Sequence, residues 1–417
     1  MKFKDWDLNL KIRLGGEAAT NLLFWTFYPF LSIYFAESFG KSWAGLLLVF
    51  SQILSVFANL IGGYCADRFG RKRMMVIATA GQSFGYGLFA LAATPWIDWP
   101  AASFAGFSIS SLFGAIYWPA SQAMVADVVP EKEQSHVFAI FYTSTNMAVV
   151  LGPLIGTQLY VNYPFAVLGA AAVVCALISI VLGHMLTETR PRGKEAVSSA
   201  SVSWRGAVWN QLRQYRIIAS DRVFLMYITG GILVAQTFMQ LDLLFPVYLE
   251  DTIRSVAFLN WQLTGEGLFG IIVSENGLMV VLFTVLVTRI MNGLRDRYAF
   301  IGGSLIFAAG IYLFSQASGF WGFFAVMAVF TLAELMTAGL QQTFIARLAP
   351  EHMRGQYYAA ASLRYTIGRT IAPLSIPLGE WIGYKPTFLA LAVLAVLSAV
   401  VYNQMFNWHE QPARSTS

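Results

Sequence analysis

Long apolar runs alternate with short polar segments along the whole chain. A helix needs about 20 mostly apolar residues to cross the hydrocarbon core of a bilayer. The pattern predicts twelve membrane-spanning helices, and the boundary near 250–267 is ambiguous because that segment is itself rather apolar. The expected helices are 14–36, 43–66, 74–94, 101–126, 135–160, 164–186, 223–249, 268–292, 298–317, 321–346, 356–381 and 386–407.

The longest polar stretch, residues 187–222, divides these helices into two sets of six. The sequence therefore predicts an all-α membrane protein with two pseudo-symmetric six-helix bundles. We expect the bundles at 1–190 and 221–417, joined by a cytoplasmic linker at 191–220.

Composition excludes most other classes of protein. Hydrophobic residues make up 57% of the chain and charged residues 12%, whereas soluble domains carry about 25% charged residues. The two cysteines, Cys65 and Cys175, lie in apolar runs and have neither disulfide nor metal spacing. The first fourteen residues alternate charges, so we expect no cleavable signal peptide. The net charge of +5 is spread over many short segments, so we expect no nucleic-acid partner.

The distribution of Lys and Arg predicts the orientation of the chain. With the N-terminus inside, 22 of the 27 basic residues lie in cytoplasmic segments and 3 in outer ones. Basic residues in short loops favour the cytoplasmic side. We therefore expect a multi-pass protein of the plasma membrane with both termini in the cytoplasm.

The two halves contain an internal repeat. Residues 125–156 align with 345–376 at a constant offset of 220. The aligned pairs are Pro130 with Pro350, Glu131 with Glu351, and Pro153 with Pro373, while Pro29 and Pro246 are a further likely pair of counterparts. Two parallel six-helix repeats are typical of secondary transporters, which bind substrate between the repeats and work by alternating access.

A loop motif lies between the second and third predicted helices, where residues 63–72 read GYCADRFGRK. This resembles the G-x-x-x-D-R-x-G-R-K signature of the major facilitator superfamily, and the resemblance implies that fold. We expect Gly63 to let two helices approach closely and the charges to latch the cytoplasmic face. The matching residues are Gly63, Asp67, Arg68, Gly70, Arg71 and Lys72.

Further segments resemble the LmrP-type multidrug/proton antiporters, namely the opening DWDLNLKIRLG, Asp127, Asp242 and Glu334. The resemblance implies export of lipophilic, often cationic compounds in exchange for protons. The resemblance also implies that Asp67 and Asp127 are proton-sensitive switches and that Asp242 and Glu334 face the drug cavity. Asp127 ends a helix, where an anion is unfavourable, so we expect a partner such as Arg68 or Arg71.

The fifth predicted helix carries the core of an antiporter motif, Gly152-Pro153-Leu154-Ile155-Gly156. Two features depart from the family pattern. Phe141 stands where the LmrP-type pattern has an acid, and the fourth predicted helix contains no Arg. The proton path is therefore expected to use fewer or different carboxylates.

Six ionisable residues lie well inside predicted helices: Glu17, Asp242, Glu275, Glu334, Arg364 and Arg369. Each costs roughly 2.5–3.5 kcal/mol on insertion scales and is by default a functional-site hypothesis. The surplus of carboxylates favours cations or protons. Glu334 is the strongest candidate for proton coupling, with a structural salt bridge to Arg364 or Arg369 as its alternative. The two arginines are possible charge partners, with Glu17 and Glu275, or else hold an anionic substrate or a lipid headgroup.

Asn21, Trp118 and Tyr142 are candidate substrate-binding residues, because amides and rings suit flat cations; the alternative is that they face lipid or core. The four histidines have no metal spacing, and no phosphate-binding glycine loop or nucleophile–base group is present. We therefore expect a non-enzymatic, monomeric transporter that uses the proton gradient and no cofactor or metal. Its partners are protons, membrane lipids and small lipophilic or cationic substrates. The alternatives are a lipid or glycolipid flippase, a metabolite exporter, and a non-transporting receptor or scaffold.

Overall fold

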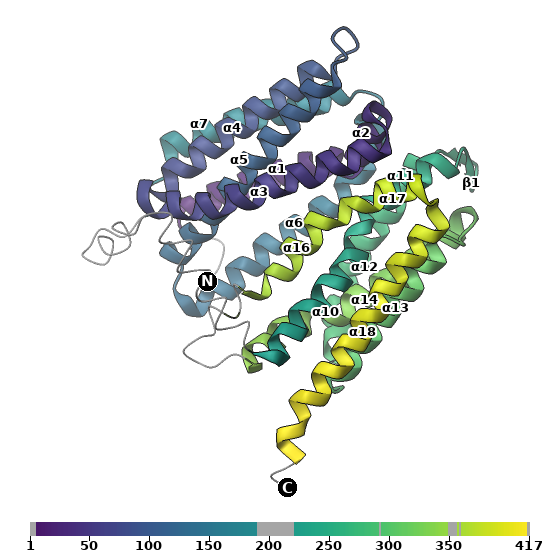
Figure 1. Ribbon diagram of the computed structural model, residues 1–417. Coiled ribbons are helices and arrows are strands. Elements are labelled where there is room, and N and C mark those ends of the chain that lie inside the picture. Colours follow the sequence, from purple (N-terminus) through teal and green to yellow (C-terminus); the bar gives the residue numbers. More distant parts are fainter. Residues whose placement is uncertain (1–5, 190–220, 292, 349–356, 358–359, 415–417) are drawn as a thin grey trace. The chain divides into compact units, whose positions relative to one another are not determined.

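The computed structural model describes residues 6–189, 221–291, 293–348, 357 and 360–414, and nearly all of them are helical (Figure 1). The predicted linker, 191–220, lies outside these residues, as do Pro350 and Glu351 of the repeat. The first half contains α1 (Leu8–Phe27), the 3-10 turn η2 (Tyr28–Phe30), α2 (Leu31–Phe39), α3 (Lys41–Phe69), α4 (Arg71–Ala92), α5 (Pro100–Val128), α6 (Glu131–Leu159) and α7 (Pro164–Met185).

The second half repeats this arrangement of long helices and short breaks. It contains α10 (Arg222–Phe238), η3 (Met239–Leu241), α11 (Leu244–Thr252), α12 (Gly265–Met291), α13 (Asp296–Phe314), α14 (Gly319–Leu348), α16 (Leu363–Ile371), η5 (Ala372–Leu374), α17 (Ser375–Trp381) and α18 (Tyr384–Arg414). The ambiguous segment near 250–267 forms an antiparallel hairpin of β1 (Val256–Phe258) and β2 (Trp261–Leu263). Its three-residue strands are too short for a sequence pattern to reveal.

An all-helical membrane protein is confirmed. Each predicted span overlaps a helix or a run of helical segments. Within the described residues, nine helices are long and apolar enough to cross a membrane. The number of twelve crossings stays a prediction, because several segments are too short or too charged to qualify.

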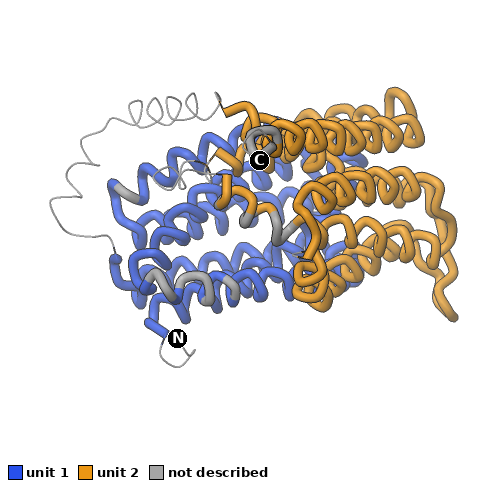
Figure 2. The backbone as a smooth tube through the Cα atoms, turned by 90° about the horizontal axis from the view of Figure 1, so that it is seen from below, with its two compact units in different colours: residues 1–39, 50–208 blue, residues 40–49, 209–417 orange. Residues whose placement is uncertain are grey.

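The chain divides into two compact units (Figure 2). Unit 1 comprises Met1–Phe39 and Phe50–Val208, and unit 2 comprises Gly40–Val49 and Trp209–Ser417. The first residues of α3 thus belong to unit 2, where Lys41 forms an ion pair with Asp251. The domain boundaries expected from the polar stretch stay a prediction. Each unit has its own core, and in unit 2 aromatic rings pack closely, with Phe245 and Phe314 stacked at a centroid distance of 3.7 Å.

Prolines break helices in both units. Proline lacks the N–H and clashes with the carbonyl four residues earlier, so it interrupts the regular ladder. Pro29 lies in η2 between α1 and α2, and Pro373 lies in η5 between α16 and α17. Pro246 follows the break between η3 and α11. The counterparts Pro29 and Pro246 thus lie at corresponding breaks in α1–α2 and α10–α11, whereas α6 continues through Pro153, the counterpart of Pro373.

Glycines of α6 allow α1 to pack against it at very short range. A Cβ added at Gly152 would lie 2.5 Å from Cβ of Trp25. One added at Gly156 would lie 2.1 Å from the carbonyl oxygen of Thr26. The Gly-Pro-x-x-Gly core therefore serves first as a packing motif in unit 1.

The close approach expected at Gly63 occurs one residue earlier. A Cβ at Gly63 would make only an ordinary contact, 3.8 Å from Cβ of Pro119. At Gly62 it would lie 2.8 Å from Cα of Ile116. The prediction for Gly63 is wrong because the helix turns Gly62, and not its neighbour, toward the backbone of α5.

Replacing Gly156 with Ala should force α1 and α6 apart and lower the free energy of unfolding by about 1–3 kcal/mol, as overpacking does. Thermal unfolding of the purified protein in detergent, followed by Trp fluorescence, measures the change. Gly169→Ala in α7 is the matched control, because nothing lies within 4 Å of a Cβ there. Equal unfolding temperatures for the two variants would contradict the packing assignment.

Candidate functional site

The candidate site in unit 2 begins at a broken helix. Regular helix ends at Phe238, continues as η3 to Leu241, and resumes at Leu244. Asp242 lies in this gap, four residues before Pro246. In a regular helix the ring of Pro246 would clash with the backbone carbonyl of Asp242. The C-terminal end of a helix carries partial negative charge. The break therefore combines a carboxylate with a helix end that favours cations.

A second broken helix packs against the first. Pro373 ends α16, and Arg369 lies four residues before it. Gly368 brings the two helices close, since a Cβ there would lie 2.6 Å from Cβ of Ala235. In Figure 1, the continuations α11 and α17 lie beside each other at the hairpin end of unit 2.

Two buried glutamines form hydrogen bonds with backbone carbonyls and a side chain at these breaks. Nε2 of Gln236 donates to the carbonyl of Gly368 at 2.9 Å. Nε2 of Gln240 donates to the carbonyl of its own helix at Gln236, and also lies 3.5 Å from the carbonyl of Ala372. The hydroxyl of Ser375 donates to Oε1 of Gln240 at 2.5 Å. An unsatisfied backbone group in an apolar interior costs several kcal/mol, so these amides make the broken backbone tolerable.

Acidic side chains gather beside the breaks. Nδ2 of Asn276, on α12, donates to Glu334 of α14 at 3.0 Å and to Thr331 at 3.0 Å. Asp242 lies near enough to Glu334 for their charges to interact, and the charge of Arg369 also acts on Asp242. Asp242, Glu334 and Arg369, selected separately from the sequence, thus belong to one electrostatic cluster.

Glu275 directly precedes Asn276 on α12 but lies in different surroundings from the acids of this cluster. It is 8% exposed, and neither carboxylate oxygen has a hydrogen-bond partner among the described residues. A buried charge without a partner is very costly, whereas a neutral acid or a cation-bound carboxylate is much less so. The surroundings of Glu275 therefore favour binding of a proton or another cation.

Arg364 has no carboxylate partner among the described residues, which contradicts the salt bridge considered from the sequence. It is 3% exposed, and Nε and Nη1 are without hydrogen bonds. Its guanidinium carbon lies 5.0 Å from the ring centroid of Tyr227 and 4.7 Å from that of Tyr365. Cation–π attraction supplies the contact that a carboxylate was expected to supply.

In unit 1 the intramembrane acid is saturated with donors. Nε of Arg13 lies 2.6 Å from Oε1 of Glu17, at the i,i+4 spacing of one helix face. The same oxygen accepts from Ser121 at 2.5 Å and from Tyr117 at 3.2 Å. Phe141, where an acid was expected by resemblance, lies under the guanidinium at 4.3 Å. Glu17 therefore has little capacity left for another cation.

The loop motif builds a second charged cluster in unit 1. Nε of Arg71 lies 3.1 Å from Oδ2 of Asp127. Arg71 is one of the two arginines expected to be partners of this acid. Gly70 has φ +103°, and a Cβ there would meet the carboxylate of Glu188. Glu188 accepts from the backbone N–H of Arg71 at 2.9 Å and so caps α4.

The remaining charged residues of the loop motif make few contacts that the described residues show. Arg68 is exposed and donates to Tyr64 at 2.7 Å. Lys72 lies in the first turn of α4. The side chain of Asp67 lies outside the described residues, so its switch function stays a prediction.

The predicted neutral binding residues are dispersed in unit 1. Nδ2 of Asn21 donates to Thr145 at 3.3 Å, which joins α1 to α6. Trp118 and Tyr142 are 57% and 59% exposed on α5 and α6. Their contact with a substrate stays a prediction.

Sequence reasoning missed Arg13, Glu188, Gln236, Gln240 and Asn276. A signal existed for Arg13, because Arg and Glu four apart on a helix face each other. A polar residue near a proline break also points to Gln236 and Gln240. Within the described residues, no three His, Cys, Asp or Glu side chains converge as a metal centre. A weakly held monovalent ion would need the carbonyl and amide oxygens as well.

Comparison with known proteins places the chain among transporters. The family model described as Major Facilitator Superfamily matches residues 15–373 and 264–417. A protein of Planococcus maritimus named Na(+), Li(+), K(+)/H(+) antiporter is 52% identical over 418 residues, covering 99% of both chains. Multidrug resistance protein MdtH of Escherichia coli (strain SE11) is 22% identical over 363 residues, covering 86% of this chain and 82% of that protein.

Solved structures give the same fold at low identity. The crystal structure of a POT family transporter in complex with 5-aminolevulinic acid matches with a TM-score of 0.74 and 15% identity, covering 96% of each chain. At this identity the likeness shows the fold alone.

Glu17→Gln should lower the free energy of unfolding by about 3 kcal/mol, because it leaves the buried Arg13 without its anion. Glu275→Gln should leave stability unchanged or raise it, since it breaks no hydrogen bond among the described residues and removes the possibility of an unpaired buried charge. Both are read from thermal unfolding of the purified protein in detergent. The reverse order of stabilities would show that the two environments have been interpreted wrongly.

Proposed function

The chain belongs to the major facilitator superfamily, and we propose that this multi-pass transporter exchanges monovalent metal cations for protons across the plasma membrane. The observation that carries the proposal is the buried carboxylate of Glu275, which lacks any hydrogen-bond donor in the described part of the chain. The next residue along α12, Asn276, donates a hydrogen bond to Glu334.

Similarity supports the choice of substrate. The relative that is 52% identical over essentially its full length is named for antiport of Na⁺, Li⁺ and K⁺ against protons. The relatives named for multidrug resistance are much more distant, at 22–24% identity. Small hard cations prefer carboxylate, carbonyl and amide oxygens, which are the groups found at the broken helices of unit 2.

Exchange follows from competition for the same carboxylates. We propose that Glu275 and Glu334 each bind either a proton or a metal cation, because a charged Glu275 without a partner is costly and Glu334 has a single donor among the described residues, Asn276. Asp242 contributes a carboxylate at the helix break, where transporters commonly place ion ligands. A proton entering the cluster from one side of the membrane then displaces the cation toward the other, and alternating access separates the two events.

The loop cluster of unit 1 is the proposed conformational switch. Arg71 holds Asp127 at 3.1 Å, and Glu188 caps the helix that carries Arg71. Protonation of Asp127 would weaken its attraction to Arg71, and we propose the same kind of switch for Asp67, which directly precedes Arg68 in the sequence. We propose that this change releases the cytoplasmic ends of the helices, with both termini on that side.

Glu275→Gln and Glu334→Gln should each reduce cation-dependent proton release by about tenfold, the effect of losing one charged interaction of about 1.4 kcal/mol. Inverted membrane vesicles with an imposed pH gradient and a fluorescent pH probe report the exchange on addition of NaCl, LiCl or KCl. Glu266→Gln, in the first turn of the same helix, is the matched control.

Loss of exchange in the Glu266 variant as well would contradict the proposal that Glu275 and Glu334 are the residues that bind the exchanged ions. A wild type that moves no protons on addition of any of the three salts would contradict cation antiport itself.

A second candidate function is export of lipophilic cations in exchange for protons. It is favoured by the relatives named MdtH and by exposed rings in unit 1, Trp118 and Tyr142. In this scheme Asn21, Trp118 and Tyr142 contact the drug, and Asp242 and Glu334 attract its charge.

Trp118→Ala should slow gradient-driven movement of a fluorescent lipophilic cation in proteoliposomes about fivefold, from the loss of about 1 kcal/mol of cation–π contact. Sodium-dependent exchange should be unchanged. Trp43→Ala, another exposed tryptophan, controls for loss of a surface ring. Equal dye movement in wild type, Trp118→Ala and protein-free vesicles would exclude this second function.

A further inference from the structure

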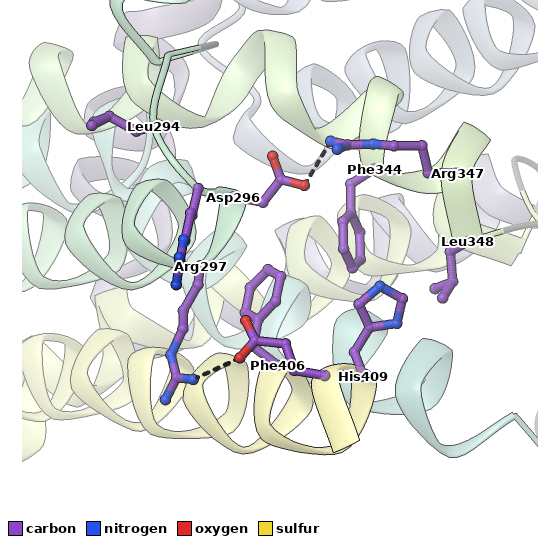
Figure 3. Close-up of a pocket in the computed structure, with 10 residues that line it drawn as sticks. Leu294, Asp296, Arg297, Phe344, Arg347, Leu348, Phe406 and His409 are labelled. Atoms are coloured by element: carbon purple, nitrogen blue, oxygen red, sulfur yellow. Dashed lines mark hydrogen bonds and ion pairs between the residues drawn. The ribbon is translucent and has the colours of Figure 1, made fainter. Parts of the chain in front are cut away.

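A polar pocket lies at one end of unit 2 and has no part in the proposed exchange. It has a volume of about 280 Å³ and lies where α13 begins and α14 and α18 end. Figure 3 shows Arg297, Arg347 and His409 on its wall, together with the rings of Phe344 and Phe406. The pocket has room for a phosphate group and several bound waters.

The charges of the pocket leave a basic surplus. Arg347 lies 2.6 Å from Asp296, and Arg297 lies 3.4 Å from Glu410 (Figure 3). These two pairs neutralise both acids of the wall. Arg295 also lines the pocket, and within the described residues it forms no ion pair. Among the described residues, the pocket therefore presents one guanidinium, that of Arg295, without a carboxylate partner.

Exposed apolar side chains lie on the segments that meet at the pocket. Leu294 lines the pocket and is 47% exposed, while Ile290 in the last turn of α12 and Tyr298 in the first turn of α13 are 55% and 60% exposed. Exposed apolar side chains beside basic ones are typical of the boundary between hydrocarbon and headgroups. This end of unit 2 is also the end that the distribution of Lys and Arg assigns to the cytoplasmic leaflet, which is rich in anionic lipids.

We propose that the pocket binds the phosphate of an anionic membrane lipid, whose acyl chains lie along Ile290, Leu294 and Tyr298. Arg295 supplies the main charge, and Arg297 and Arg347 supply further N–H donors around the phosphate. A lipid held here joins the ends of α13, α14 and α18. The proposal is independent of which ion or drug the protein transports.

The test measures lipid binding to the full chain purified in detergent, by native mass spectrometry. Phosphatidylglycerol and phosphatidylcholine with identical acyl chains are titrated separately, and inorganic phosphate is added in a third series. Arg295→Gln should weaken binding of phosphatidylglycerol about fivefold, which corresponds to about 1 kcal/mol for one basic residue at an anionic surface. Arg295→Lys should retain most of the binding.

Arg254→Gln is the matched control, because Arg254 is exposed beside the hairpin at the opposite end of α12. Equal affinity of wild type, Arg295→Gln and Arg254→Gln for phosphatidylglycerol would overturn the proposal. Inorganic phosphate that binds through Arg295 without any preference for phosphatidylglycerol over phosphatidylcholine would overturn the lipid assignment, and would identify a soluble phosphate as the ligand.

Discussion

Polar backbone that a broken helix exposes inside an apolar bundle must find partners within the protein. Pro246 and Pro373 break two neighbouring helices of unit 2, and Gln236 and Gln240 bond with carbonyls and side chains around those breaks. The same breaks give Asp242 a position outside regular helix. The proposed cation site, built from oxygen atoms, would thus follow from how the bundle tolerates its own prolines.

The two units treat their buried acids differently. In unit 1, Glu17 receives Arg13, Ser121 and Tyr117 and is satisfied. In unit 2, Glu275 has no described donor, although a buried arginine, Arg364, lies in the same unit between tyrosine rings. Keeping that guanidinium away from the carboxylate leaves the acid available to protons and cations. This contrast places the proposed exchange chemistry in unit 2.

Hydrophobic pattern and one loop motif were enough to predict the helical membrane fold and the family, because span length and loop charge are local properties of the sequence. The intramembrane acids were also found, since their cost in an apolar segment marks them. What each acid contacts depends on packing between helices distant in sequence. That is why the sequence did not predict the contacts of Asn276, of Gln236 or of the rings around Arg364. It is also why the close helix approach was assigned to Gly63, whereas the structure has it at Gly62.

The most direct test of the central claim is proton release when a metal cation binds. Purified protein in weakly buffered detergent is titrated with NaCl while the pH is recorded, with choline chloride as the ionic-strength control. Competition for Glu275 and Glu334 predicts release of protons on adding Na⁺, and less release in Glu275→Gln. Sodium binding without any change in bound protons would contradict the account.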